Sequence, residues 1–390
     1  MPQFDEPAEY AELRAAVRAI TDKHGAAEYA EHGYRGESQT ELWNDLGDAG
    51  FIGINVPERF GGGGAGMSEL VLVAEESASA GCPLLLLLVS SAISVEVLAR
   101  HGSPEQQQEW LTRLADGHTK MAFAITEPDA GSNSHKITTT ARRVESDDGV
   151  HYVISGSKYY ISGVDESAAI LTVTRTGVDP DTGKAQISLF IVPTDAEGLT
   201  ATPLAVAAQI PDRQFTVYYD DVRVPASALV GAEGGGFRPL FDGLNPERIT
   251  SAALCVGIGR YALTKAAEYA SSRTVWGGVP IGTHQGVAHP LAEAKVAVEL
   301  AALMTAKAAW LHDNGMPAGE AANMAKYAAA EAALSAVDAA IQTHGGNGLS
   351  AEYGLLPLWG MARLLRIAPV NREMVLNYIA QHSLGLPRSY

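Results

Sequence analysis

The sequence predicts a multidomain α+β fold, in which a helical domain is followed by an antiparallel β domain and then by a helix bundle. Two changes of pattern along the 390 residues predict it. Apolar residues recur at helical spacing up to about Gly117, short β-branched runs fill the centre, and long alanine-rich segments follow. We therefore expect an all-α domain over residues 1–120, a β-barrel or sandwich over 121–230 and a four-helix bundle over 231–390.

The N-terminal part contains four segments with helical periodicity. They are ELRAAVRAITDK, ELWNDLGDAGFIGI, SELVLVAEESASA and PEQQQEWLTRLADG. Before the last of them, Ser103 precedes Pro104, an order typical of a helix N-cap and first helical position. The Gly-x-Gly-x-x-Gly pattern of Gly61–Gly66 has no strand before it, so it predicts a turn between helices and not a dinucleotide site.

The central part, from Met121 to about Val230, consists of short runs with strand character. They are MAFAIT, KITTTARRV, VHYVISGSKYYIS, AAILTVTR, QISLFIVPT and QFTVYYDDVRVP. Turn-forming residues separate them at intervals of about ten residues, which is typical of an antiparallel barrel or sandwich.

The C-terminal part, from Phe237 onward, consists of long alanine-rich segments with short connections, which favour a helix bundle. Alanine lets helix backbones approach closely and leaves flat faces. Such faces suit packing against another copy of the chain as much as an internal core.

Composition excludes several classes of protein. Acidic residues number 45 against 28 basic ones, and the formal net charge of -17 opposes binding to nucleic acid or anionic lipid. Cys82 and Cys255 lie far apart, which fits a reducing cytosol. The acidic N-terminus does not read as a signal peptide, and the apolar run Pro83–Ala99 contains serines and Glu96, so it predicts a buried helix. We expect a cytoplasmic protein with no membrane or nucleic-acid partner, and the scattered histidines predict no metal site.

One loop carries polar groups suited to binding a ligand. The stretch AITEPDAGSNS, residues 124–134, ends a predicted strand and turns through Pro128 and Gly131 into two serines and an asparagine. Its backbone N–H and hydroxyl groups could hold a phosphate or the edge of a heteroaromatic ring. Taken alone, an ordinary hairpin loop explains the stretch equally well.

Six segments in order carry a resemblance to a known family. They are FAITEPDAGSN, GSKYYISG, YYDDVRVPASALVG, NPERI, SSRTVWGGVPIGTHQGVAHPLAE and IQTHGGNGLSAEYG. Together they resemble the acyl-CoA dehydrogenase family of flavoproteins, from about Gly25 to about residue 380. The resemblance implies the same three-domain fold, FAD as cofactor and a homotetramer in which neighbouring subunits share each FAD.

The resemblance also implies cofactor contacts. Thr126 is expected at the polar edge of the isoalloxazine, Ser132 beside the pyrophosphate and the substrate, Tyr160 stacked at the flavin, and the Ser162 hydroxyl at N5. Tyr160 stands where the family often has tryptophan and keeps a large aromatic face. The full set carried over is Thr126, Ser132, Tyr160, Ser162, Arg273, Trp276, Gln342, Gly345, Gly346 and Asn371.

Part of this set is expected to act on a second subunit. Arg273 and Trp276 match an arginine and a phenylalanine that reach the neighbouring subunit's FAD, and an arginine suits a pyrophosphate. Gln342 and the glycines of Gly345–Gly348 match the loop at the adenosine end, where missing side chains permit close approach. The same glycines also read as a helix stop.

The family reaction needs one carboxylate to remove the α proton of an acyl thioester while the β hydrogen leaves as hydride. Many relatives supply it from a YEGT motif, but this chain has APVN there, with Pro369 at the base position. In the isovaleryl-type and long-chain-type members, the glutamate precedes the arginine of the first bundle helix. Glu247, followed by Arg248, stands at that position and is expected to be the catalytic base.

Glu247 also has an interpretation without catalysis. Asn245 and Pro246 read as a helix N-cap and first helical position, and the helix dipole favours a glutamate in the first turn by about 0.3 to 1 kcal/mol. If Glu247 is the base, partial desolvation should raise its pKa. Arg248, expected at the substrate, would limit that rise and direct the carboxylate, or would pair with another carboxylate across the bundle.

Pro369 departs from the family pattern in a second way. Relatives use the backbone N–H at that position to polarise the thioester oxygen, and proline has none. Three readings remain: a shift of the chain that brings another N–H into place, polarisation by the FAD ribityl hydroxyl, or an unusual substrate. Pro357 and Met361 also replace a basic and an acidic residue that the family pattern has after the glycine loop.

These observations predict an acyl-CoA dehydrogenase that passes electrons to an electron-transfer flavoprotein. A flavin oxidase or monooxygenase of the same fold is one alternative. A non-catalytic subunit of a heteromeric enzyme is the other, since Pro369 departs from the catalytic pattern.

Overall fold

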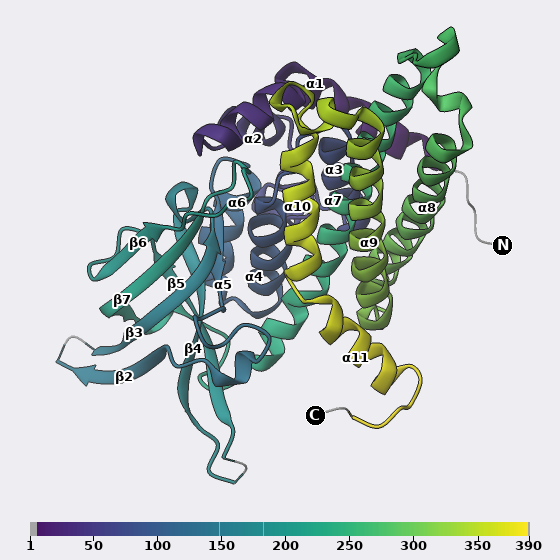
Figure 1. Cartoon of the computed structure of the whole chain (residues 1–390). Coiled ribbons are helices and arrows are strands. Elements are labelled where there is room, and N and C mark those ends of the chain that lie inside the picture. The colour runs from purple at the N-terminus through teal and green to yellow at the C-terminus, as the bar shows by residue number, and fades with distance from the viewer. Residues whose placement is uncertain (1–5, 148, 182, 389–390) are drawn as a thin grey trace.

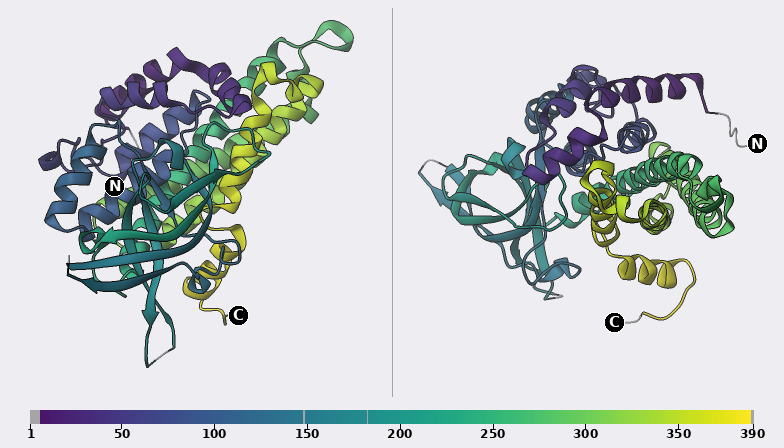
Figure 2. Two further views of the ribbon diagram at one scale, coloured as in Figure 1. Left: turned by 90° about the vertical axis from the view of Figure 1, so that its left-hand side faces the viewer. Right: turned by 45° about the horizontal axis from the view of Figure 1, so that its top comes forward.

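The computed structural model describes residues 6–147, 149–181 and 183–388. Figures 1 and 2 show the β domain on one side of the molecule and the long helices on the other, with α1 and α2 across one end. Residues 1–5 and 389–390, which begin and end the two expected outer domains, lie outside the described residues. The order of helical, β and helical parts confirms the predicted fold class.

The N-terminal part is helical throughout. Its helices are α1 (Ala8–Arg35), α2 (Thr40–Asp48), α3 (Met67–Ser79), α4 (Val95–His101), α5 (Pro104–Gln106) and α6 (Thr112–Ala115), with 3-10 turn Glu58–Phe60 and π-helical segments Leu87–Ser94 and Gln107–Leu111. Ser103 caps α5 as predicted, because its Oγ accepts the Gln106 N–H at 3.2 Å. The predicted second helix is too long, since α2 ends at Asp48 and the apolar residues 51–54 form turns. Gly61–Gly66 forms the predicted turn before α3.

The apolar run Pro83–Ala99 is buried, as predicted, and lies partly in the π-helical segment and partly in α4. None of the described helices has the length and apolar character that crossing a bilayer requires. Cys82 and Cys255 are buried free thiols.

The β domain is one eight-stranded sheet. Its strands are β1 (Met121–Ala124), β2 (Thr140–Ser146), β3 (Gly149–Ser162), β4 (Ala169–Val178), β5 (Ala185–Pro193), β6 (Leu199–Pro203), β7 (Gln214–Pro225) and β8 (Leu229–Val230), in the order β6-β7-β3-β2-β4-β5-β8 with β1 beside β4. Most pairs are antiparallel, but β1 runs parallel to β4, as does one bridge between β2 and β4. The sequence did not indicate β6, because its residues are mostly exposed and show no apolar alternation.

The C-terminal part is built on α7 (Phe237–Ser272), which packs against α8 (Gln285–Asp313) and α9 (Gly319–His344). Two shorter helices follow, α10 (Leu355–Ile367) and α11 (Arg372–His382). Most of the buried residues of α9 are alanines, so the backbones of α7 and α9 approach closely. At Gly257 of α7, a Cβ atom would lie 2.4 Å from the Glu75 carbonyl oxygen, so only glycine permits this contact with α3.

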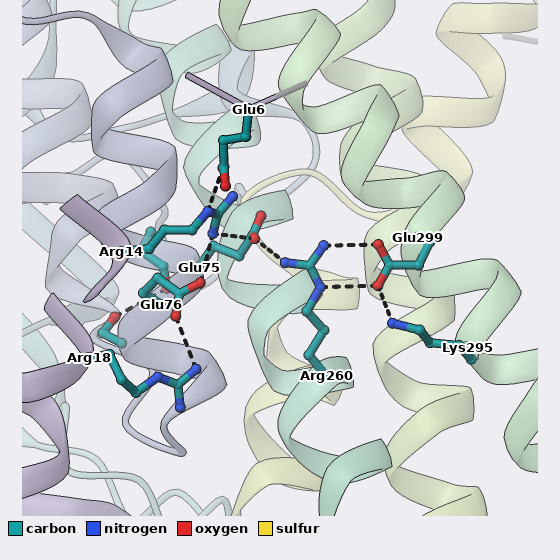
Figure 3. A network of polar contacts seen from close by, with 10 residues as sticks. Glu6, Arg14, Arg18, Glu75, Glu76, Arg260, Lys295 and Glu299 are labelled. Atoms are coloured by element: carbon teal, nitrogen blue, oxygen red, sulfur yellow. Dashed lines mark hydrogen bonds and ion pairs between the residues drawn. The ribbon is translucent and has the colours of Figure 1, made fainter. Parts of the chain in front are cut away.

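A network of charged side chains joins α1, α3, α7 and α8 (Figure 3). Glu75 of α3 is buried, and its carboxylate pairs with Arg14 at 2.7 Å and with Arg260. Arg260 also pairs with Glu299 of α8 at 3.0 Å. One hydrophobic core lies around this network and unites the N-terminal helices with the bundle. The bundle is therefore held against the N-terminal domain by both apolar packing and buried charge.

Candidate active site

The loop between β1 and β2 is fixed by a buried ion pair. Glu127 accepts hydrogen bonds from the Lys158 ammonium at 2.9 Å and from the backbone N–H groups of Thr138 and Thr139 at 2.6 and 2.9 Å. Burial acts to raise the pKa of Glu127, but Lys158 and these N–H groups outweigh it and lower the pKa to about 2. Lys158 also donates to the Ile125 carbonyl at 3.0 Å, so both ends of the loop are tied to β3.

Thr126 and Tyr160 lie close together at the start of this loop. The Thr126 carbonyl accepts the N–H of Tyr159 at 2.8 Å, which joins the loop to β3. Tyr160 has a φ of 57° and is 55% exposed. A positive φ is unusual for a bulky residue and turns the side chain out of the strand. An aromatic face is thereby presented to solvent beside Thr126.

Ser132, at the exposed tip of the loop, meets the C-terminal part of the chain. The Asn371 amide donates a hydrogen bond from Nδ2 to Ser132 Oγ at 2.6 Å. Asn371 also caps α11, since its Oδ1 accepts the Met374 N–H at 2.8 Å. Because Ser132 Oγ accepts this bond, its own proton remains free to be donated to another oxygen.

Ser162, at the end of β3, has a partner that sequence reasoning missed. Its hydroxyl donates to Gln214 Oε1 at 2.9 Å. The orientation of the Gln214 amide is set by its Nε2, which donates to the Asp212 carbonyl at 3.0 Å. Nothing in the sequence near Gln214 indicated this role, because it depends on the pairing of β3 with β7.

Glu247 is buried in α7, about three turns after the helix begins at Phe237. Its side chain makes no hydrogen bond with any residue that the structure describes, and only 8% of the residue is exposed. Burial raises the pKa of its carboxyl to about 7, and the positive charges of Arg248 and Lys326 oppose that rise. The interpretation of Asn245 as an N-cap is wrong, because α7 begins at Phe237 and contains Pro246. The helix dipole at the first turn therefore does not explain this glutamate.

The charge of Arg248 limits the pKa rise of Glu247, as expected, but the contacts of Arg248 differ from the expected ones. Its guanidinium donates to Asn245 Oδ1 at 3.0 Å, and it forms no ion pair with Glu247 or with any other carboxylate in the described part of the chain. It therefore opposes the pKa rise of Glu247 through space without fixing the carboxylate's direction. Arg248 Nε is buried and makes no hydrogen bond to the described residues.

A second residue that sequence reasoning missed is Lys326 of α9. Only 1% of it is exposed, and its ammonium donates to the carbonyl oxygens of Arg366, at 3.2 Å, and of Val370. The sequence did carry a signal, because Lys326 occupies the same helical stripe as Ala322, Ala329 and Ala333, which are buried.

The other predicted cofactor residues lie at the far end of the bundle. Arg273 and Trp276 follow α7, and Trp276 is 93% exposed. Gln342, Gly345 and Gly346, at the end of α9, are exposed as well. At a rise of 1.5 Å per residue, Arg273 lies about 39 Å along α7 from Glu247. One chain therefore does not bring this group to its own Glu247.

The site combines a polar loop, an exposed aromatic face and a buried carboxylate in the first long helix of the bundle. On this three-domain fold, these features are those of a flavoprotein dehydrogenase. Comparisons with known proteins agree with this class. The chain matches the acyl-CoA dehydrogenase N-terminal domain over residues 7–118, the middle domain over 122–222 and the C-terminal domain over 234–384.

Individual relatives match along almost the full length. The chain is 55% identical over 389 residues to acyl-CoA dehydrogenase FadE12 of Mycobacterium tuberculosis, with 99% of each chain covered. The solved structure of butyryl-CoA dehydrogenase from Megasphaera elsdenii superimposes with a TM-score of 0.91 at 26% identity, covering 98% of this chain and 100% of that one. The FAD complex of PigA superimposes with a TM-score of 0.90 at 26% identity, covering 98% and 99%. This chain belongs to the acyl-CoA dehydrogenase family.

The residues present fit FAD. Tyr160 offers an exposed aromatic face to a flat ring, and the free proton of Ser132 suits a phosphate oxygen. At Gly345 and Gly346, no atom lies within 4 Å of the position that a Cβ would take, so a ligand can approach the backbone there. Arg273 forms no ion pair with the described residues, which leaves its charge for a phosphate.

Proposed function

We propose that this protein catalyses the FAD-dependent α,β-dehydrogenation of an acyl-CoA thioester to the trans-2-enoyl-CoA, with Glu247 as the base. The observation that carries the proposal is the buried Glu247 carboxylate, which makes no hydrogen bond to the described residues and has its pKa raised to about 7. A carboxylate with such a pKa is substantially ionised at neutral pH and still basic enough to accept a proton.

In the reaction, the bond between Cα and its hydrogen breaks and the proton passes to a Glu247 carboxylate oxygen. FAD, when bound, supplies the two-electron acceptor that takes the β hydrogen together with its bonding electrons. The electron pair left at Cα forms the new double bond. Burial of most of Glu247 limits the contact of its carboxylate with water.

Two groups of residues from different subunits would hold the cofactor. Thr126, Tyr160 and Ser162 would lie at the flavin ring, with Ser132 and Asn371 beside the pyrophosphate. Arg273 and Trp276, with Gln342 and the following glycines, would serve the FAD of a neighbouring subunit, because they lie at the opposite end of α7 from Glu247.

A homotetramer is part of this proposal. Apolar side chains of α8 point outward at helical spacing, namely Val296, Leu300, Leu303 and Trp310, each 55–63% exposed. An apolar stripe of this kind favours packing against another chain. An electron-transfer flavoprotein is the proposed electron acceptor, as the family resemblance implies.

Pro369 bears on how the thioester oxygen is polarised. It lies in the connector between α10 and α11, residues 368–371, and has no N–H to donate. The neighbouring Ala368 N–H is bonded to the Leu364 carbonyl at 2.8 Å. Loss of one such donor costs about 2.7 to 4 kcal/mol of activation energy where it is not replaced. This departure keeps a non-catalytic subunit of a heteromeric enzyme as an alternative, and a flavin oxidase or monooxygenase of the same fold is the second candidate.

The test is an anaerobic titration of the purified holoenzyme with a panel of acyl-CoAs of different chain length and branching. Loss of the flavin's visible absorbance with formation of enoyl-CoA is the expected result. Absorbance that returns rapidly on admission of air, with peroxide or an oxygenated product, would favour the second candidate. A chain that retains FAD and is reduced by none of the panel would contradict the proposal.

A further inference from the structure

Lys326 is a buried lysine whose charge the proposed reaction does not use directly. Burial lowers its pKa to about 8, so most of it is protonated at neutral pH. It lies in the first third of α9, on the face that packs against α7 and α10. Two of its three ammonium protons are donated to main-chain carbonyls at the end of α10 and in the connector. Burying a lysine without a directly bonded carboxylate is costly, so its retention requires a compensating interaction.

The main charges that act on Lys326 come from two helices. They are those of Glu247, Cys255 and Arg248 on α7 and that of Arg366 on α10. Burial raises the pKa of the Cys255 thiol to about 12, so it is neutral at physiological pH. The two arginines repel the ammonium. Glu247 is therefore the anion of this set, and its ionised form is the one that Lys326 stabilises.

The same ammonium reaches the cofactor loop through the main chain. Val370, whose carbonyl Lys326 holds, is followed by Asn371, whose side chain bonds Ser132. A fixed Val370 carbonyl restricts the connector and hence the direction of the Asn371 amide. Lys326 thus donates a hydrogen bond to the carbonyl of the residue before Asn371, which is a predicted cofactor contact. Its charge also acts on Glu247, the proposed base.

We propose that Lys326 is a positioning residue for the active site, which favours the ionised form of Glu247 through its charge and fixes the connector through its hydrogen bonds to the carbonyl oxygens of Arg366 and Val370. The inference rests on the proposed role of Glu247 as base. The contacts that link Val370 to Ser132 through Asn371 are present in this chain and do not depend on the reaction.

The two effects separate in two substitutions. Lys326→Gln keeps an amide that can donate to a carbonyl group and removes the charge. Lys326→Met removes both. Lys265→Met is the matched control, because Lys265 also lies on a bundle helix but its side chain is 43% exposed and pairs with Glu268 at 3.4 Å. Its ammonium also lies 5.7 Å from the ring centroid of Tyr261.

The first measurement is the pH dependence of flavin reduction in the holoenzyme at saturating acyl-CoA. In the wild type, activity should rise with pH as Glu247 loses its proton. Without the Lys326 charge, this rise in activity (the acid limb of the pH profile) should move to higher pH by about one unit or more. At pH values above the shifted limb, the rate of Lys326→Gln should return close to the wild-type rate. A merely structural role would lower the rate at every pH and leave the limb in place.

The second measurement is FAD dissociation followed by flavin fluorescence, which does not depend on turnover. The methionine variant should lose FAD several-fold more readily than the glutamine variant, and the control should match the wild type. Where the methionine variant does not fold, the glutamine variant decides the question through its pH limb. A folded Lys326→Gln protein with an unshifted limb overturns the inference. Failure of the proposed function is distinguishable, because Glu247→Gln would then retain full activity whatever Lys326 does.

Discussion

The Asn371 amide lies 2.6 Å from Ser132 Oγ, and it joins the connector before α11 to the loop after β1 across 239 residues of sequence. Both residues were expected at the cofactor from separate segments of the chain. Their contact means that the β domain and the bundle meet at the proposed pyrophosphate site. The Ser132 hydroxyl keeps its proton available for a ligand oxygen, while one of its two lone pairs accepts the Asn371 N–H.

Replacing Asn371 by aspartate tests this contact. The substitution preserves an oxygen that can cap α11, and aspartate is as good an N-cap as asparagine, but it removes the donor to Ser132 and adds a negative charge. We expect an unchanged melting temperature of the apoprotein and at least about five-fold weaker FAD binding, which corresponds to about 1 kcal/mol. Equilibrium titration by flavin fluorescence measures the affinity. Unchanged FAD affinity would separate Asn371 from the cofactor.

The pair formed by Glu127 and Lys158 should make stability depend on acid pH. The pKa of Glu127 is lowered to about 2 in the folded chain, and burial lowers the pKa of Lys158 to about 8. The pair therefore stabilises the fold most between the ordinary carboxyl pKa of about 4.5 and pH 8. Its effect is lost as pH falls toward 2. Glu127→Gln leaves a buried lysine unpaired and should cost about 3 to 5 kcal/mol at neutral pH. Urea unfolding at a series of pH values should show the gap between variant and wild type narrowing in acid. A gap that is constant with pH would refute the assignment.

The network of Figure 3 predicts a stability change far from the active site. Arg260→Met leaves the buried Glu75 with Arg14 alone and should lower the free energy of unfolding by about 1 to 3 kcal/mol. Arg143→Met is the control, because Arg143 is exposed and pairs with the exposed Glu145, where a loss within about 0.5 kcal/mol is expected. Equal losses in the two variants would show that burial of Glu75 does not strengthen the network.

Sharing of the cofactor between subunits predicts complementation. Arg273→Gln and Ser132→Ala should each weaken FAD binding, because one variant damages the site of a neighbour and the other damages its own. Mixed assemblies of the two variants should regain some intact sites, each formed by Ser132 of one chain and Arg273 of another. Absorbance of bound flavin after mixing and reassembly is the measurement. No recovery would mean that both residues serve a site on one chain.

The three-part fold was readable in the sequence because periodicity is a local property. Helical spacing, strand alternation and the Ser103 cap each depend on residues close together in the chain, and these predictions are confirmed. Prediction from the sequence failed where one local pattern is compatible with two different structures. Asn245 and Pro246 have the residue types of a helix start, yet α7 begins earlier and runs through them, because Leu240 and Gly243 of the preceding turns pack against the N-terminal helices and the β domain.

The parts of the site that the sequence did not indicate depend on long-range contacts. Gln214 becomes the partner of Ser162 only when β3 and β7 pair, and Lys326 finds Val370 only when α9 packs against the end of α10. Lys326 was visible as a charge on an apolar stripe, but its acceptors are carbonyl groups, which every residue has. Glu247 was found by its family position, and its burial came from the fold.

The most direct test of the proposed base is anaerobic reduction of the flavin in Glu247→Gln by a good acyl-CoA substrate. Glutamine has nearly the same shape and cannot accept the α proton. The account predicts that this variant binds FAD and substrate normally while the rate of flavin reduction falls by about 10² to 10⁴-fold. Reduction at the wild-type rate would contradict it.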